Sequence, residues 1–185
     1  MMKKTSSYLK ELAVVTIGVL IALLLNNWKE SREARQFYEK SLITVQQEME
    51  ENQADLSFVL NHQMALLDTV QNHLTDSTSV SELIQRAGGL KSATIRNVGL
   101  DIYARNDISN LDYATLSRLM QMKSLSGLID NKMNKLMDFI YPNTFERSSE
   151  SKELLSVFLS NLIESEAQLN HIYLSFRTEK SLPNE

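Results

Sequence analysis

The side chains best suited to chemistry in this chain are its three histidines, His62, His73 and His171. On one helix, His62 and His73 would share a face but lie about 16 Å apart along the axis. A single metal ion cannot bridge that distance, and the chain has no Cys to supply a thiolate ligand. The sequence therefore predicts no metal site and no cofactor.

Carboxylates form the other candidate cluster, at Glu48, Glu50 and Glu51. Clustered carboxylates are a setting for acid–base chemistry, but in a helical segment they are more typical of a solvated face. The sequence also lacks the zinc-protease, P-loop, dinucleotide-binding and hydrolase-elbow motifs. We therefore expect that the chain is not an enzyme.

Length and composition predict a helical protein. The chain has 185 residues with only 5 Gly and 2 Pro, too few for the turns of a many-stranded β protein. Good helix formers such as Leu, Glu, Gln, Lys and Met are prominent. The net charge is −4 and the basic residues are dispersed, so nucleic acid is not an expected partner.

The first element is an apolar run over residues 12–25, which carries no charge. A membrane-spanning helix needs about 20 residues, a length reached by counting residues 8–27. At the edges, Lys10 can extend its amine to the lipid headgroups, and Trp28 suits the opposite interface. We predict that residues 1–28 form an N-terminal tail and a transmembrane anchor, with membrane lipid as its partner.

Two other interpretations fit this run: a cleaved signal peptide and a buried core helix. The start Met1-Met2-Lys3-Lys4 is basic enough for a signal peptide, but no small-x-small cleavage site follows the run. Lys and Arg are nearly balanced between the flanks, so the positive-inside rule decides little. The short N-terminal tail favours a single-pass signal anchor in a bacterial inner membrane, with the C-terminal domain in the periplasm.

The anchor resembles that of a family of uncharacterised single-pass membrane proteins from Bacteroidota, catalogued as a domain of unknown function. In that family a Glu opens an apolar run that contains a Gly and an Ala and ends in Asn-Asn-Trp. The matching residues here are Glu11, Gly18, Ala22, Asn26, Asn27 and Trp28. A second block also matches, in residues 112–116, 126–129 and Tyr141, whereas Lys10 and Leu24 depart from the pattern. The resemblance implies an architecture and no activity.

Residues 29–74 are predicted to form a long amphipathic helix that continues from the anchor. They contain no Pro or Gly, and apolar residues recur mostly at helical spacing, with Gln53 and Gln71 as interruptions. The stripe could be a coiled-coil seam or the core face of a bundle, and the lack of regular flanking charges favours the bundle. Its apolar members are Leu42, Val45, Met49, Leu56, Leu60, Met64, Leu67 and Leu74.

Residues 75–110 are predicted to be a linker with short elements. Ser79 and Glu82 have the spacing of a capping box for a helix that begins at Val80. Gly88 and Gly89 would end that helix. Residues 94–98 fit either a short strand or a helical turn.

Residues 111–142 are predicted to form a helical hairpin, and residues 143–185 a C-terminal helix with a frayed tail. Asp112 would cap the first hairpin helix, and Ser126-Gly127 would form the corner with Gly127 at positive φ. Asp130 would cap the second helix, which Pro142 would end. On this interpretation Gly127→Ala should lower stability. The hairpin tyrosines Tyr113 and Tyr141 are expected in the core. The whole pattern predicts an all-α fold, with a transmembrane helix continuing into a long helix and then a helical bundle.

One face of the anchor is suited to self-association. Gly18 and Ala22 form a small-x-x-x-small pair, which lets two helix backbones approach closely in lipid. Glu11, Val15 and Asn26 extend the same face at spacings of three and four residues. Chance proximity of small residues is the competing explanation.

Two functions fit these predictions. The first is a membrane-anchored structural or interaction subunit without catalysis, which self-associates or binds another membrane protein. The second is a single-pass sensor or accessory domain that binds a ligand or peptide between its helices. The sequence names neither the partner nor the ligand.

Overall fold

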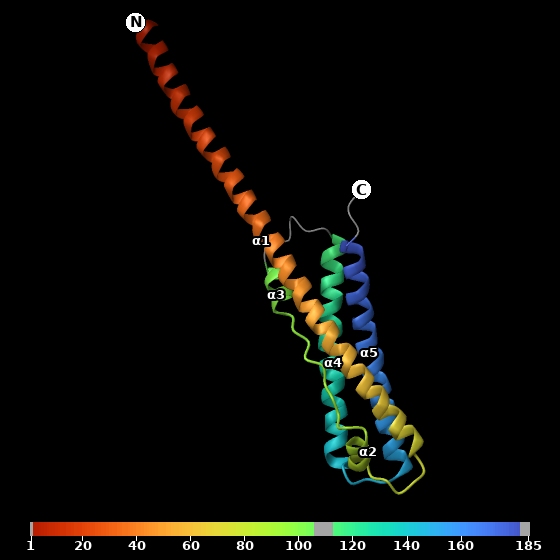
Figure 1. Ribbon diagram of the computed structural model, residues 1–185. Helices are drawn as coiled ribbons and strands as arrows, with labels where there is room; N and C mark the ends of the chain where they lie inside the picture. The colour runs from red at the N-terminus through yellow and green to blue at the C-terminus, as the bar shows by residue number, and fades with distance from the viewer. Residues whose placement is uncertain (1, 106–112, 182–185) are drawn as a thin grey trace. The chain divides into compact units, whose positions relative to one another are not determined.

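The computed structural model describes residues 2–105 and 113–181, with side chains at 11–102 and 113–176. Five helices follow one another: α1 (Met2–Asn72), α2 (Val80–Arg86), α3 (Val98–Arg105), α4 (Tyr113–Asn143) and α5 (Ser149–Ser181) (Figure 1). The described residues contain no strand. The all-α prediction is therefore confirmed, including one long apolar N-terminal helix followed by further helices.

The chain divides into two compact units, Met1–Ile43 and Thr44–Glu185. The first consists of the N-terminal part of α1. The second, here called the helical unit, contains the rest of α1 and the other four helices. The helix predicted to continue from the anchor as far as Leu74 is present, and it ends at Asn72, followed by a turn.

The core of the helical unit has the same spacing on α1 and α5. Buried residues recur alternately three and four positions apart, a heptad spacing that places them on one face of each helix. On α1 these are Val45, Met49, Asn52, Leu56, Val59, Gln63, Leu66 and Val70. On α5 they are Lys152, Leu155, Leu159, Leu162, Glu166, Leu169, Tyr173 and Phe176.

The predicted stripe on α1 is buried from Val45 to Leu60 and then follows the wrong register. Met64 is 52% exposed, whereas Leu66 and Val70 are buried. The cause is that Asn52 and Gln63 occupy core positions, so a pattern built from apolar residues alone drifts off the buried face. The polar residues that the sequence marked as interruptions, Gln53 and Gln71, are not core residues.

The predicted hairpin corner at Ser126-Gly127 is wrong, because α4 runs unbroken through it. Ser126 is a buried helix residue, and positive φ is found at Gly88 and Gly89 but not at Gly127. Asp130, predicted as a cap, lies within the same helix. A helical hairpin does exist, but it consists of α4 and α5, which pack along one another. Residues 144–148 form the corner that connects them.

Helix α4 ends near the predicted stop, with Pro142 inside its last turn. Pro142 has no N–H to donate to the preceding turn and its ring crowds the carbonyl four residues earlier, so it weakens the helix, which ends one residue later at Asn143. The tyrosines predicted to lie in the core are instead on the surface, with Tyr113 83% and Tyr141 71% exposed. Both lie near an end of α4, beyond the heptad positions that face α5.

The linker predictions are confirmed around α2. The Ser79 side chain accepts from the Glu82 backbone N–H, and the Glu82 carboxylate accepts from the Ser79 N–H. Gly88 and Gly89 follow the helix with φ of 83° and 93°, the left-handed region that glycine favours. Residues 94–97 form neither a strand nor a helical turn, and α3 begins at Val98.

Three sequence predictions fall on residues that the structure does not describe. The cap at Asp112, the side chain of Lys10, and the tail from residue 182 onwards lie outside the described residues. Helix α5 extends to Ser181, so the part of the tail before that residue is helical.

We expect Gly127→Ala to stabilise the protein by about 0.5–1 kcal/mol, because glycine is a poor helix residue and nothing lies within 4 Å of an added Cβ. Thermal unfolding of the full chain in detergent micelles measures this change. Gly99→Ala is the matched control. Its Cβ would meet Glu48 Oε2 at 3.0 Å and the Val45 backbone nitrogen at 3.2 Å, so that variant should be destabilised. A loss of stability in Gly127→Ala would restore the corner interpretation.

Candidate functional site

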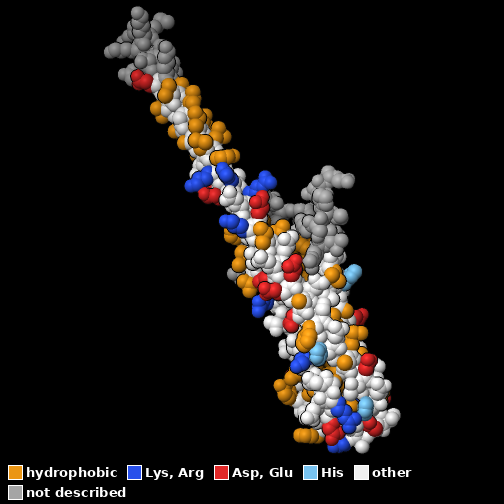
Figure 2. Space-filling model, viewed as in Figure 1, with side chains coloured by type: hydrophobic (Ala, Val, Ile, Leu, Met, Phe, Trp, Pro, Cys, Tyr) orange, Lys and Arg blue, Asp and Glu red, His pale blue; other side chains and the backbone are white. Residues whose placement is uncertain are grey.

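The apolar run of α1 is exposed over its whole length. Its large hydrophobic side chains from Leu12 to Leu25 are between 52% and 70% exposed, and none of this stretch is buried. Figure 2 shows hydrophobic side chains covering the visible surface of this part of the helix, followed by basic and acidic side chains. Among the described residues, one helix, α1, is long and apolar enough to cross a membrane, and its apolar run is not packed against the rest of the described chain.

The C-terminal edge of this run carries an exposed aromatic side chain followed by charged side chains. Trp28 is exposed, and the Arg32 guanidinium lies 5.6 Å from the centre of its ring. Such a cation–π contact holds a cation beside the indole. The exposed pairs Lys29–Glu33 and Arg35–Glu39 follow on the next turns. Of the two predicted interface residues, Trp28 thus has a suitable setting, and the side chain of Lys10 is not described.

The predicted association face lies along the exposed run. Gly18 has nothing within 4 Å of an added Cβ, so another helix could approach it closely. Asn26 donates to Glu30 Oε1 at 2.7 Å within the same helix. The face formed by Glu11, Val15, Gly18, Ala22 and Asn26 stays a predicted interface.

In the helical unit, residues 91–99 run along α1 in the opposite direction. Gln63 donates to the Lys91 carbonyl, and Asp55 accepts from the Thr94 N–H. Further along, Glu48 accepts from the Gly99 N–H. Gln63 and Glu48 are separated by about 22 Å along the helix axis, so the segment is largely extended before α3 begins at Val98. We call residues 91–99 the strap.

The Asn52 side chain makes two hydrogen bonds to the strap, both to the backbone of Arg96. Its amide donates to the Arg96 carbonyl at 2.7 Å and accepts from the Arg96 N–H at 2.9 Å. One side chain thus satisfies both backbone polar groups of a residue that has no strand partner. The Arg96 side chain also pairs with Glu51 at 2.8 Å, on the exposed surface.

The acidic cluster predicted to be a solvated face therefore has a structural role. Glu48 and Glu51 both bind the strap. The Glu48 carboxylate accepts an N–H in the first turn of α3, where helix donors have no intrahelical partner. On the other side of the strap, the Asn97 amide nitrogen donates a hydrogen bond to Ser126 Oγ on α4. The strap consequently ties α1 to α4.

Asn52 also reaches the opposite helix, where it donates to Tyr173 Oη at 3.3 Å. Burial raises the pKa of Tyr173 to about 12, so its hydroxyl stays protonated. The two side chains line a cavity of about 10 Å³ beneath the strap. That volume admits about one water molecule, so this cavity is not a ligand site by itself.

A second polar layer lies farther along the bundle, between Gln63 on α1 and Glu166 on α5. Both side chains are buried, and the Gln63 amide nitrogen donates to Glu166 Oε1 at 3.2 Å. Burial is the main cause that raises the pKa of Glu166 to about 7; the negative charge of Asp55 adds to the rise and the Gln63 hydrogen bond opposes it. The pKa of the Glu166 carboxyl therefore lies close to neutral pH.

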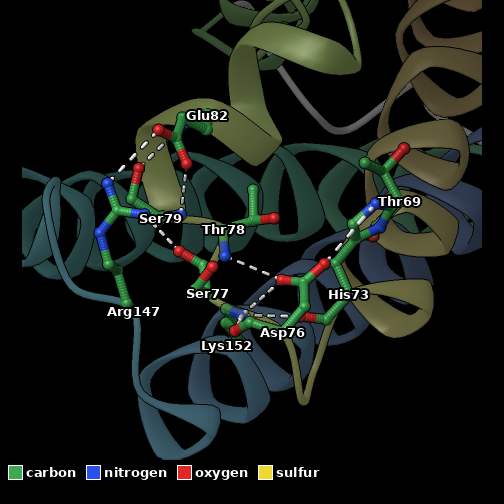
Figure 3. A network of polar contacts seen from close by, with 9 residues as sticks. All are labelled: Thr69, His73, Asp76, Ser77, Thr78, Ser79, Glu82, Arg147 and Lys152. Carbon is green, nitrogen blue, oxygen red and sulfur yellow. Dashed lines mark hydrogen bonds and ion pairs between the residues drawn. The ribbon is translucent and has the colours of Figure 1, made fainter.

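A third polar group, Lys152, closes the end of the bundle (Figure 3). Its ammonium is fully buried and donates to the carbonyls of His73 and Asp76 at 2.7 and 2.6 Å. It also pairs with the Asp76 carboxylate at 3.1 Å. The buried charge is thus matched by three acceptors from the turn that follows α1.

The loop after α1 and the corner between α4 and α5 hold this end together. The Val80 and Ser81 N–H groups at the start of α2 donate to the carbonyls of Glu146 and Thr144. Arg147 donates to the Ser77 carbonyl and pairs with Glu82. The network in Figure 3 therefore connects α1, α2 and α5 through hydrogen bonds and ion pairs.

Hydrogen bonds from backbone N–H groups also lower the pKa values of the two carboxyl groups in this network. The Thr78 N–H is the largest cause that lowers the pKa of Asp76 to about 2. The Ser79 N–H likewise lowers the pKa of Glu82, with a smaller contribution from Arg147. Both carboxylates stay ionised at neutral pH, as a cap and an ion pair require.

Sequence reasoning missed the polar core residues that organise the helical unit. Asn52, Gln63, Glu166 and Lys152 all lie at heptad positions, so a search for a strict three–four spacing that admits polar residues could have found them. The histidines predicted not to form a metal site are not brought together. Within the described residues, no group of three or more His, Asp or Glu could hold a metal ion.

No family model, curated protein or solved structure matches the chain.

We expect Asn52→Ala to destabilise the helical unit by roughly 1–3 kcal/mol, because it leaves the Arg96 backbone groups and the Tyr173 hydroxyl without their partner. Hydrogen exchange on the full chain in detergent should show faster exchange of the Arg96 amide. The control is Gln47→Ala, an exposed amide on the same helix, which should change stability by less than about 0.5 kcal/mol. Equal exchange at Arg96 in both variants would contradict the role given to Asn52.

Proposed function

We propose that this protein is a membrane-anchored helical subunit whose helical unit serves interaction and not catalysis. The observation that carries the proposal is the apolar run of α1, whose large side chains are exposed between Leu12 and Leu25. Apolar side chains over such a length are stable only when lipid or another apolar surface covers them. The helical unit has its own core, so it can fold beside the membrane.

The residues with perturbed pKa values support an interaction role over an enzymatic one. Glu166 and Tyr173 are buried between helices, where a substrate has no access, and Asp76 and Glu82 serve the caps at the end of the bundle. A catalytic group needs to reach a reacting atom in a concave site. We therefore propose no reaction for this chain.

We place the anchor in a bacterial inner membrane with the helical unit in the periplasm. The resemblance of the anchor to Bacteroidota membrane proteins supports the first part. The orientation with the N-terminus inside is part of this proposal, and the flanking positive charges are too nearly balanced to oppose it.

We expect the full chain to stay in the membrane fraction through a carbonate wash, because removing the apolar run from lipid would expose it to water. The absence of Cys allows the orientation to be read in the same cells. A membrane-impermeant maleimide should label Ser160→Cys, an exposed position on α5, and should not label Ser6→Cys before lysis. Soluble protein that begins after residue 28 would show a cleaved signal peptide and overturn the anchor. Labelling of Ser6→Cys alone would reverse the orientation.

The alternative function is a sensor that binds a peptide, and one observation favours it. The face of α1 that holds the strap recognises the backbone of an extended segment through Asn52, Asp55 and Gln63. Such a face suits a peptide as well as the chain's own strap. Purification from detergent separates the two functions: a stoichiometric protein partner or an oligomer supports the interaction subunit, and a retained peptide or small molecule supports the sensor.

We further expect the anchor to self-associate through Gly18 and Ala22. Gly18→Ile should block close approach of two helices while it keeps the run apolar, so insertion should survive and association should be lost. Cross-linking of the full chain in membranes measures this. Val19→Ile is the matched control, because it adds one methylene beside the proposed face and should leave association unchanged. A monomeric wild type, or equal cross-linking of Gly18→Ile, would show that this face is not an interface.

A further inference from the structure

Two of the buried oxygens without a hydrogen-bond partner belong to one pair of side chains. Among the described residues, three such oxygens are found, on Gln63 (Oε1), Glu166 (Oε2) and Asn170 (Oδ1). Gln63 and Glu166 are already joined through their other atoms, at 3.2 Å. Buried polar atoms are nearly always hydrogen-bonded, so two unpartnered acceptors in the same pair require an explanation.

The orientation of the Gln63 amide is set by the strap. Its nitrogen has two N–H groups: one donates to the Lys91 carbonyl at 3.1 Å and the other to Glu166 Oε1. A backbone carbonyl can only accept, so turning the amide over would place two oxygens together at Lys91. Gln63 Oε1 is therefore left as an acceptor that needs a donor from elsewhere.

We propose that Glu166 is a proton-binding site inside the helical unit, and that its protonated Oε2 donates to Gln63 Oε1 to complete a cyclic acid–amide pair. One proton then satisfies both orphaned oxygens. When the proton leaves, only the O–H bond breaks and the proton passes to solvent. The two oxygens that remain can both only accept, so the pair loses one of its two hydrogen bonds and holds a buried negative charge.

The charged groups around Glu166 are consistent with a neutral acid. Asp55 on α1 is negative and disfavours a second negative charge. Lys132 on α4 reaches α5 but donates to the Asn161 carbonyl and to Ser165 Oγ. His62, the neighbour of Gln63 on α1, forms a hydrogen bond with the Phe58 carbonyl through Nδ1. Lys91 contributes its carbonyl to the pair, and its side chain is exposed.

Protonation of Glu166 is linked to the position of the strap through Gln63. Gln63 holds Lys91 with the same nitrogen that contacts Glu166, so movement of the amide on deprotonation would loosen the first hydrogen bond of the strap. The pKa of Glu166 is raised from its ordinary value of 4.5 to about 7. The unfolded chain therefore releases this proton at lower pH than the folded chain does. Stability from this group is complete below about pH 4.5 and is lost as the pH rises through about 7.

The test compares thermal unfolding of the full chain in detergent micelles with that of Glu166→Gln, at about pH 5 and about pH 8. Glutamine keeps the size of the side chain and supplies a permanent N–H donor to Gln63 Oε1. The two proteins should melt at similar temperatures at the lower pH, and the variant should melt several degrees higher at the upper pH. Glu164→Gln, an exposed carboxyl on α5, should show the same offset from wild type at both pH values.

Infrared spectroscopy of the wild type tests the proton directly, even if the variant fails to fold. At about pH 6 ordinary carboxyl groups are ionised, so a protonated carboxylic acid should appear as one carbonyl band that disappears by about pH 8.5. Absence of that band, or an offset of Glu166→Gln that does not change with pH, would overturn the proposal. Either result would mean that Glu166 is ionised and that a buried water satisfies the two oxygens.

Discussion

The helical unit depends on a single requirement: a polar side chain placed in a helix core must find hydrogen-bond partners there. Asn52, Gln63 and Lys152 occupy core positions at successive levels of the bundle. Leaving such a group without a partner costs about 1–3 kcal/mol, and more when it is charged. Each of the three donates to the backbone of a non-helical segment, in addition to a group on the facing helix or in the turn after α1. The connections are therefore as necessary to the core as the helices are.

This requirement also fixes the register of the helices. In an apolar core, a helix can slide by one heptad at modest cost, because Leu and Val pack in many arrangements. Asn52 opposite Tyr173, and Gln63 opposite Glu166, allow one alignment of α1 against α5. A polar residue at a core heptad position is the best-attested device for selecting one register. The strap adds a second constraint, because its hydrogen bonds to α1 match only when Arg96 lies beside Asn52.

The sequence was informative where local chemistry decides the structure. Three local features were predicted correctly: the capping box at Ser79, the helix end at Gly88-Gly89, and the unbroken helix that follows from the absence of Pro and Gly after residue 29. Each depends on residues that are close together in the sequence. Gly127 was misread because a Ser-Gly pair looks like a helix end, while the packing of Ser126 and Ile129 against the bundle keeps α4 helical. Tertiary contacts can override a glycine that costs about 1 kcal/mol.

The candidate sites also differ in whether the sequence could predict them. The exposed apolar run of α1 could be predicted because its length and composition are properties of consecutive residues, whereas the layers Asn52–Tyr173 and Gln63–Glu166 join residues more than a hundred positions apart. Gln63 and Glu166 carry no local signal, since Gln and Glu are ordinary surface residues of helices. Their burial becomes visible only when both helices are aligned on one heptad pattern. Once they are aligned, a carboxyl and an amide face each other in an apolar setting, where a carboxyl is more stable neutral than charged. The same arrangement that selects the register thus also creates a group whose charge follows the pH of its compartment.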